Sequence, residues 1–227
     1  RPPGPQGLSP ASFGSGRAPM PEPLTCFKAS DIRGRIPGEI NEDVACRIGR
    51  AIGEFLAARE VVVGHDIRLS GPALSAALAR GLNAAGVDVI DIGLCGTEEV
   101  YFATSHLGAS GGIMVTASHN PADYNGMKLV RAGSRPVSGD TGLLEIRRRA
   151  EELAGAALPG MPRQGGVRRA DPRQDYVRHL LGYVDRDRLK PLHLVMNAGN
   201  GSAGPVVDAL ERELPFRLTR SRECAPA

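Results

Sequence analysis

Short apolar runs recur along this chain, and stretches with helical spacing separate them. The runs span residues 61–64, 87–92, 112–117, 127–130 and 192–196. Apolar runs of this length, bounded by glycine or polar turns, are typical of buried strands. Because helical stretches alternate with them, the pattern predicts an α/β fold. We expect a mixed, largely parallel sheet with helices on both faces.

The intervening stretches carry apolar residues three and four positions apart, which is the spacing of an amphipathic helix. Asn41 can cap the first of these helices, whose apolar positions are Val44, Ile48, Ile52, Phe55 and Leu56. Ser70, Gly71 and Pro72 open a second helix that ends near residue 86, because proline is favoured in the first turn. Further helices are predicted over residues 97–107, about 140–153, from 171 onward, and about 205–214.

The chain divides by composition into three parts. Residues 1–23 hold seven prolines and four glycines with almost no aliphatic residues, so we expect a disordered head. Residues 24–160 form the first predicted domain. Residues 161–227 are expected to contain a linker and the beginning of a second α/β domain, with the Gly-, Pro- and Arg-rich stretch 155–170 as the connection. On this interpretation the second domain is truncated and the chain is a fragment.

The overall composition excludes several classes of protein. Hydrophobic residues make up 41% of the chain, yet no apolar run approaches the roughly 20 residues of a membrane span. With no signal-peptide pattern either, we expect a cytoplasmic protein without a membrane partner. The net charge is +3 and only nine aromatic residues occur, which argues against a nucleic-acid partner. The four cysteines lack metal-ligand spacing, and nothing indicates the oligomeric state.

The candidate chemistry lies where the run 112–117 ends in Ser118, His119, Asn120 and a proline. This places a serine hydroxyl at a strand-to-loop corner, where α/β proteins present their reactive groups. The following run, residues 127–130, carries Lys128 back toward the same corner. A serine before Asn-Pro is by itself often only a turn former, and a lone loop histidine is usually structural. Together with a cation at fixed spacing, however, the pattern indicates a serine that handles phosphate, since a phosphoserine carries about −1.5 to −2 charge.

Several segments resemble motifs of the phosphohexomutases, the phosphomannomutase/phosphoglucomutase family. Residues 116–121, TASHNP, are similar to the family's phosphoserine loop, and residues 27–34, FKASDIRG, resemble its FKAYDIRG signature. Residues 64–68 resemble a G-x-D-x-R turn, residues 91–99 resemble the DIG…GTEE segment, and residues 196–201 resemble the glycine loop that opens the second domain. The motifs agree in order and spacing over about residues 24–215.

The resemblance implies phosphoryl transfer within one phosphosugar, which would be the substrate. It makes Ser118 the phosphocarrier and one ligand of Mg²⁺, with a hexose 1,6-bisphosphate as activator. Arg33 and Lys128 would be cations that assist transfer, and His119 a neighbour suited to acid–base work. The TAS and GTEE forms imply interconversion of mannose 1-phosphate and mannose 6-phosphate, with glucose phosphates as a further possibility. Asn120 and Asp123 are expected to shape the loop. Arg68 is left open between a functional role and a salt-bridged loop residue.

The sequence departs from the family pattern in two respects. Ser30 stands where the family signature has tyrosine, which removes an aromatic hydroxyl. The family's metal loop, DGDxDR, is missing from the chain. Residues 185–188, DRDR, imitate part of it but lack the glycine and the third carboxylate, and we interpret them as a charged helix terminus.

Two alternative functions remain open from the sequence alone. Residues 199–204 form a literal GxGxxG between a strand and a helix, and Glu223 lies near the distance expected of a ribose-binding acid. These features favour a dinucleotide-binding oxidoreductase, although few residues follow the last glycine. The other alternative is a non-catalytic, phosphosugar-binding fragment.

Overall fold

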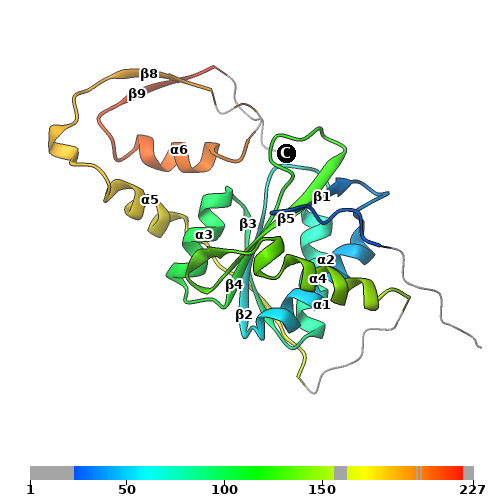
Figure 1. The fold of residues 1–227 in the computed structure, drawn as a ribbon. Coiled ribbons are helices and arrows are strands. Elements are labelled where there is room, and N and C mark those ends of the chain that lie inside the picture. The colour runs from blue at the N-terminus through cyan, green and yellow to red at the C-terminus, as the bar shows by residue number, and fades with distance from the viewer. Residues whose placement is uncertain (1–22, 156–162, 198, 200, 222–227) are drawn as a thin grey trace, which may run out of the picture.

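The structure is a computed structural model that describes residues 23–155, 163–197, 199 and 201–221. The predicted disordered head therefore lies outside the described residues, except for its last position. Within the described ranges, the first part of the chain forms one seven-stranded mixed sheet in the order β1-β5-β4-β2-β3-β7, with β6 paired to β5 (Figure 1). The strands are β1 (Ile32–Arg35), β2 (Glu60–His65), β3 (Asp88–Leu94), β4 (Gly111–Val115), β5 (Tyr124–Arg131), β6 (Arg135–Pro136) and β7 (Val167–Arg169).

The sheet has a parallel half and an antiparallel half. Strands β4, β2, β3 and β7 run parallel to one another, whereas β5 is antiparallel to β1, β4 and β6. The mixed α/β sheet expected from the sequence is confirmed. The return strand β5 carries Lys128, so this lysine lies on the antiparallel partner of the strand that leads to Ser118.

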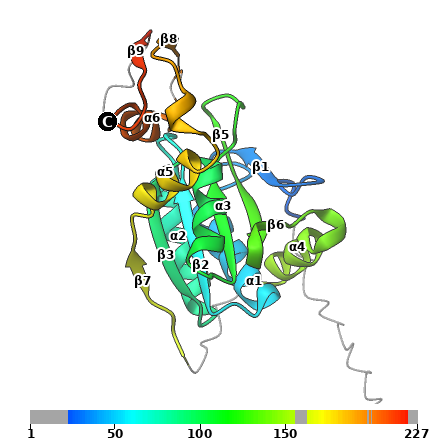
Figure 2. The ribbon, with the colours of Figure 1, turned by 90° about the vertical axis from the view of Figure 1, so that its left-hand side faces the viewer.

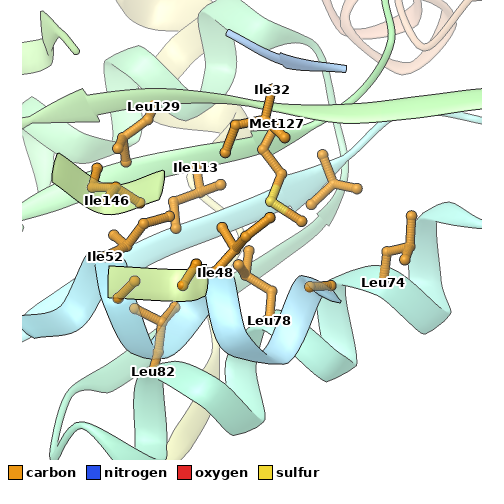
Figure 3. Packing of buried hydrophobic residues seen from close by; sticks show 14 of the residues in the cluster. Ile32, Ile48, Ile52, Leu74, Leu78, Leu82, Ile113, Met127, Leu129 and Ile146 are labelled. Atoms are coloured by element: carbon orange, nitrogen blue, oxygen red, sulfur yellow. The ribbon is translucent and has the colours of Figure 1, made fainter. Parts of the chain in front are cut away.

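Helices cover both faces of the sheet, as the continuous apolar runs predict. Val61 and Val63 of β2 pack with α1 (Glu42–Leu56), α2 (Gly71–Ala84) and α4 (Leu143–Glu152), whereas Val62 packs with α3 (Thr97–His106) on the other face. Figure 3 shows the larger core, in which helix residues meet strand residues that are almost fully buried. The labelled residues are Ile32, Ile48, Ile52, Leu74, Leu78, Leu82, Ile113, Met127, Leu129 and Ile146.

Local sequence signals account for where several helices begin and end. The side chain of Asn41 accepts a 2.9 Å hydrogen bond from the backbone N–H of Val44 and caps α1 as predicted. The single helix expected over about 140–153 is instead a short 3₁₀ turn, η2 (Gly139–Thr141), followed by α4. Gly142 separates the two with a φ of 134°, and a Cβ atom there would lie 2.0 Å from the ring of Phe55. Only glycine fits this position.

The segment expected to be an interdomain linker differs from that expectation. Residues 167–169 form β7, which pairs in parallel with Val89, Ile90 and Asp91 of β3 and extends the sheet by one strand. Asp88 fixes the approach to β7, because its carboxylate accepts hydrogen bonds from the backbone of Gly166 and the guanidinium of Arg163. A composition rich in Gly, Pro and Arg did not reveal this edge strand.

The remaining elements form a small second unit. They are α5 (Arg173–Leu181), η3 (Arg186–Arg188), β8 (His193–Met196), α6 (Gly204–Glu211) and β9 (Arg217–Arg220), and β8 pairs in parallel with β9. Figure 2 shows β8, β9 and α6 beyond one end of the main sheet, with α5 beside α3. Ring contacts join α5 to α3, since Phe102 lies 5.4 Å from Tyr176 and 5.1 Å from His179 between ring centroids. No helix in the described ranges is long and apolar enough to cross a membrane.

Candidate active site

Three sequence motifs lie side by side, one on β1, one on β5 and one just after the end of β4. Arg33 of β1 lies opposite Gly126 of β5, and the backbone N–H of Thr116, just after β4, donates a 3.0 Å hydrogen bond to the carbonyl of the same Gly126. A Cβ atom at Gly126 would lie 2.0 Å from the carbonyl oxygen of Ile32. The glycine therefore permits the close approach of β1 to β5 and keeps the three motifs in register.

Ser118 lies on a loop just past the end of β4, as the sequence predicts. Its side chain is exposed, and its backbone has a φ of 55°, in the left-handed region. Its N–H donates a 2.9 Å hydrogen bond to the hydroxyl of Thr116, and Asn120 N–H donates to the carbonyl of Ala117. The Oγ of Ser118 lies 3.4 Å from Nδ1 of His119, which is also exposed. The structure thus brings the two predicted polar residues together at the surface.

The two predicted cations share one buried carboxylate. Asp31 is 6% exposed, and its Oδ2 lies 2.5 Å from the guanidinium of Arg33 and 3.7 Å from Nζ of Lys128. Arg33 also donates a 2.8 Å hydrogen bond to Oδ1 of Asn120 in the serine loop. One carboxylate facing two cations leaves a formal excess of positive charge beside the loop, which favours an anion such as a phosphoryl group.

The contacts of these cations differ from the direct approach to Ser118 that its sequence spacing suggested. Among the described residues, no hydrogen bond joins Arg33 or Lys128 to the hydroxyl of Ser118. Instead, Arg33 reaches the serine loop through Asn120, and Lys128 is held to Arg33 through Asp31. Their side chains remain 27% and 32% exposed, so both are open to a bound group.

An open cleft of about 1080 Å³ lies in front of Ser118. Its walls include His119 and Asn120 from the serine loop, Glu98 at the start of α3, and Ser202 and Ala203 before α6. The cleft therefore lies between the main sheet and the second unit. A space of this size is in the range of small-molecule sites.

The buried thiols near the sheet are not competing nucleophiles. Burial raises the pKa of Cys95, whose sulfur lies 4.0 Å from that of Met114, to about 12. Burial likewise raises the pKa of Cys26 to about 11. At neutral pH both thiols stay protonated, and the thiolate is the reactive form.

Sequence reasoning missed two polar residues that organise this site. Asp31 lies two positions before Arg33, so the two-residue period of a strand places both side chains on one face of the sheet. Thr116 is the first residue past β4, where a hydroxyl can cap the turn. Both signals were present in the sequence, but each was weak by itself. Ser30, the departure from the family signature, is exposed next to Asp31.

The other candidate segments contribute less. Within residues 185–188, Arg186–Arg188 form the 3₁₀ turn η3, and Asp185 caps it by accepting a hydrogen bond from Asp187 N–H, in keeping with a charged terminus. The described ranges contain no group of three His, Cys, Asp or Glu side chains that could hold a metal ion. The proposed dinucleotide loop, residues 199–204, includes residue 200, which lies outside the described residues, as does Glu223.

Comparison with known proteins decides the family. Residues 25–155 match the family described as phosphoglucomutase/phosphomannomutase, alpha/beta/alpha domain I. The chain belongs to this family. It is 61% identical over 192 residues to a phosphomannomutase of Salmonella typhimurium, an alignment that covers 84% of the chain and 42% of that relative. It is 59% identical over 197 residues to a protein of Xanthomonas campestris named phosphohexose mutases, covering 87% of the chain and 43% of the relative.

Solved structures give the same fold. A phosphoglucomutase/phosphomannomutase family protein from Burkholderia thailandensis has a TM-score of 0.75 and 38% identity, covering 86% of the chain and 43% of that protein. A structure described as a putative phosphomannomutase from Thermus thermophilus has a TM-score of 0.70 and 28% identity, covering 88% and 46%. The chain thus spans about two fifths of the length of the curated relatives it matches. None of these proteins supports the oxidoreductase alternative.

Proposed function

We propose that this chain supplies the phosphoserine domain of a phosphohexose mutase that interconverts mannose 1-phosphate and mannose 6-phosphate, with glucose phosphates as further substrates. The observation that carries the proposal is the exposed Ser118 at the end of β4, with the Asp31-linked pair Arg33 and Lys128 on the neighbouring strands. Membership of the family and the mutase names of its relatives support the same activity.

In this proposal the phosphoryl group moves between Ser118 Oγ and a sugar hydroxyl. The Oγ–P bond breaks as a new P–O bond forms to the free hydroxyl of a hexose monophosphate, and the hydroxyl proton is transferred to the serine oxygen. The resulting 1,6-bisphosphate turns over in the cleft and returns its other phosphate by the reverse step. His119, 3.4 Å from Oγ, is placed to relay the proton. Arg33 and Lys128 stabilise the negative charge that develops on the moving phosphoryl group.

The proposal includes Mg²⁺ and a hexose 1,6-bisphosphate activator, but the described residues supply only part of a Mg²⁺ site. Ser118 can offer one oxygen, but a divalent ion of this kind takes about six, and the described residues hold no group of three His, Cys, Asp or Glu side chains that could bind it. The residues present therefore do not fit the ion by themselves. A phosphosugar partner, the absence of a nucleic-acid partner and a cytoplasmic location stay expectations.

Phosphate mapping tests the proposal directly. We expect Ser118 to carry phosphate in a full-length chimera, in which the aligned segment of this chain replaces the matching 192 residues of the Salmonella typhimurium relative, after incubation with mannose 1,6-bisphosphate and analysis of its peptides by mass spectrometry. Ser105→Ala is the matched control, because Ser105 contacts Ser134, away from the cleft. It should label like the unmodified chimera, whereas Ser118→Ala should not label. Phosphate on Ser105, Ser110 or Ser134 would contradict the assignment.

Turnover can be measured in the same chimera. We expect the chimera to convert mannose 1-phosphate to mannose 6-phosphate and to lose this activity in the Ser118→Ala variant. A folded chimera without turnover, or one whose activity survives the loss of Ser118, would contradict the proposal.

A further inference from the structure

Arg68 pairs with Asp66, but most of its contacts are hydrogen bonds to the backbone of the serine loop. Its Nη2 donates to the carbonyls of Ser118 and Asn120 at 3.0 and 2.7 Å. Its Nη1 donates to the carbonyls of Pro121 and Tyr124 at 2.7 and 2.8 Å. The four terminal N–H groups of the guanidinium thus bind four carbonyl groups spread over the whole loop, and the side chain is only 12% exposed.

The carboxylate of Asp66 provides a second connection to the backbone of the same serine, through the hydroxyl of Thr116. Its Oδ2 lies 3.4 Å from Nε of Arg68 and accepts a 2.5 Å hydrogen bond from the hydroxyl of Thr116. That hydroxyl in turn accepts a 2.9 Å hydrogen bond from the N–H of Ser118. The N–H of Ser118 is therefore fixed through Thr116 and Asp66, and its carbonyl is fixed by Arg68. The N–H and the carbonyl of Ser118 are thus both connected to residues of the turn that follows β2.

The backbone of Ser118 needs such support. Its φ of 55° is a left-handed conformation that non-glycine residues adopt at an energetic cost. A residue persists there when its surroundings over-determine it, and such residues cluster at functional sites. The side-chain direction of Ser118 follows from this backbone conformation. Whatever holds the backbone also aims the hydroxyl toward the cleft.

We propose that Arg68 is a positioning residue that holds Ser118 in its left-handed conformation and so aims the hydroxyl for phosphoryl transfer. The proposal rests on the function proposed above and deepens it, because it assigns the geometry of the nucleophile to a residue whose guanidinium binds the backbone of the serine loop. Lysine could not replace arginine in this role. Its ammonium presents three N–H groups from one point, whereas the guanidinium fork spans four acceptors.

The kinetic test uses Arg68→Lys in the chimera, which keeps the charge and removes the fork. We expect kcat to fall by about 10²-fold, because a displacement of about 1 Å at the reacting atom costs that much, while KM for mannose 1-phosphate stays unchanged. Arg35→Lys is the matched control, because the side chain of Arg35 contacts the side chains of Tyr124 and Asp123 and not the backbone carbonyls of the loop. It should keep the kcat of the unmodified chimera. An Arg68→Lys chimera with unchanged kcat and a lowered Tm would overturn the proposal.

Thr116→Val provides a second variant that preserves shape if Arg68→Lys does not fold. It deletes the hydroxyl that joins Ser118 N–H to Asp66. We expect the same signature, a lower kcat with an unchanged KM. A kcat equal to that of the unmodified chimera would contradict a role for the Thr116–Asp66 connection in holding Ser118.

A stability cycle in the 227-residue chain separates this proposal from the proposed function. Ser118→Gly relieves the left-handed strain, and its effect on the unfolded chain is the same whether or not Arg68 is present. We expect the change in Tm caused by Ser118→Gly to be more favourable in the unmodified background than in Arg68→Lys. Equal changes in Tm in both backgrounds would refute the proposal that Arg68 holds Ser118 in its left-handed conformation. This result does not depend on turnover, so it stands even if Ser118 is never phosphorylated and the proposed function fails.

Discussion

Arg33 donates a 2.8 Å hydrogen bond to the side-chain oxygen of Asn120, 87 residues further along the chain. The contact joins the first motif of the sequence to the serine loop and explains why Asn120, expected only to shape the loop, does more. It ties the loop to the cation that the proposed reaction uses. Displacing either partner should therefore disturb both.

Removing either cation should reduce activity much more than stability. For Arg33→Ala and Lys128→Ala in the chimera, we expect kcat to fall by about 10²-fold or more, since each variant deletes a charge aimed at the phosphoryl group. Lys28→Ala is the control, because Lys28 lies in the same motif but binds the carbonyl of Thr25. If kcat is retained while Tm falls, the two residues are merely structural partners of Asp31.

Gly126→Ala should destabilise the chain strongly. The new Cβ would lie 2.0 Å from the carbonyl oxygen of Ile32, so β1 must move away from β5. Overpacking of this kind costs about 1–3 kcal/mol or more of unfolding free energy. The control is Gly38→Ala, where a Cβ atom meets no atom within 4 Å. Denaturant titration measures both, and equal unfolding free energies would show that β1 yields without cost.

The buried thiols should resist alkylation in the folded chain. Burial raises the pKa of Cys26 to about 11 and that of Cys95 to about 12, and raises the pKa of the half-buried Cys46 as well. At pH 8 we expect iodoacetamide to label Cys46 faster than the other two, and all three in denaturant. Because folding raises these pKa values, the stabilisation is complete below pH 9 and is lost as pH rises toward 11–12. Rapid labelling of Cys95 at pH 8 would contradict its burial.

The attachment of β7 should depend on the charge of Asp88. Hydrogen bonds from Gly166 N–H and then Arg163 lower the pKa of this carboxyl below its ordinary value of 3.8. A lowered pKa means that the stabilisation is present above pH 3.8 and is lost as pH falls through the lower value. We expect Asp88→Asn to increase hydrogen exchange in residues 167–169 at neutral pH.

Asp140→Asn is the matched control for that experiment. Asp140 is an exposed aspartate that also has a lowered pKa, caused first by a hydrogen bond from Ser138, but it lies away from β7. Unchanged exchange of β7 in Asp88→Asn, or an equal increase in Asp140→Asn, would show that β7 pairs without this anchor.

The sequence predicted the architecture better than it predicted the contacts. Continuous apolar runs such as 61–64 indicated strands buried on both faces, and the structure confirms this through Val62 and its neighbours Val61 and Val63. The edge strand β7 escaped notice because an edge strand is largely exposed and needs no apolar run: all three of its residues are exposed. Its partner strand β3 lies about 80 residues earlier in the sequence, and a local pattern carries no information about such a partner.

The site shows the same division. The strand-to-loop pattern pointed to Ser118 and Lys128, and the family resemblance added Arg33 and His119; the structure brings these residues to one end of the sheet. Neither the pattern nor the resemblance revealed that Asp31 links the two cations, or that Arg68 binds four carbonyl groups. Contacts to backbone carbonyls leave no trace in the identity of the residues contacted, so only the folded geometry could show which groups Arg68 binds.

The pairing of β7 with β3 also brings the segment that follows it against the main sheet. Beyond β7, Arg173 donates to the carbonyl of Leu94 and pairs with Glu99, and Asp175 lies 3.2 Å from His106. The chain thus stays fastened to the main sheet through α5, well past the segment that its composition marks as a connection. Because Tyr176 of α5 lines the cleft in front of Ser118, part of the cleft wall comes from this fastened helix.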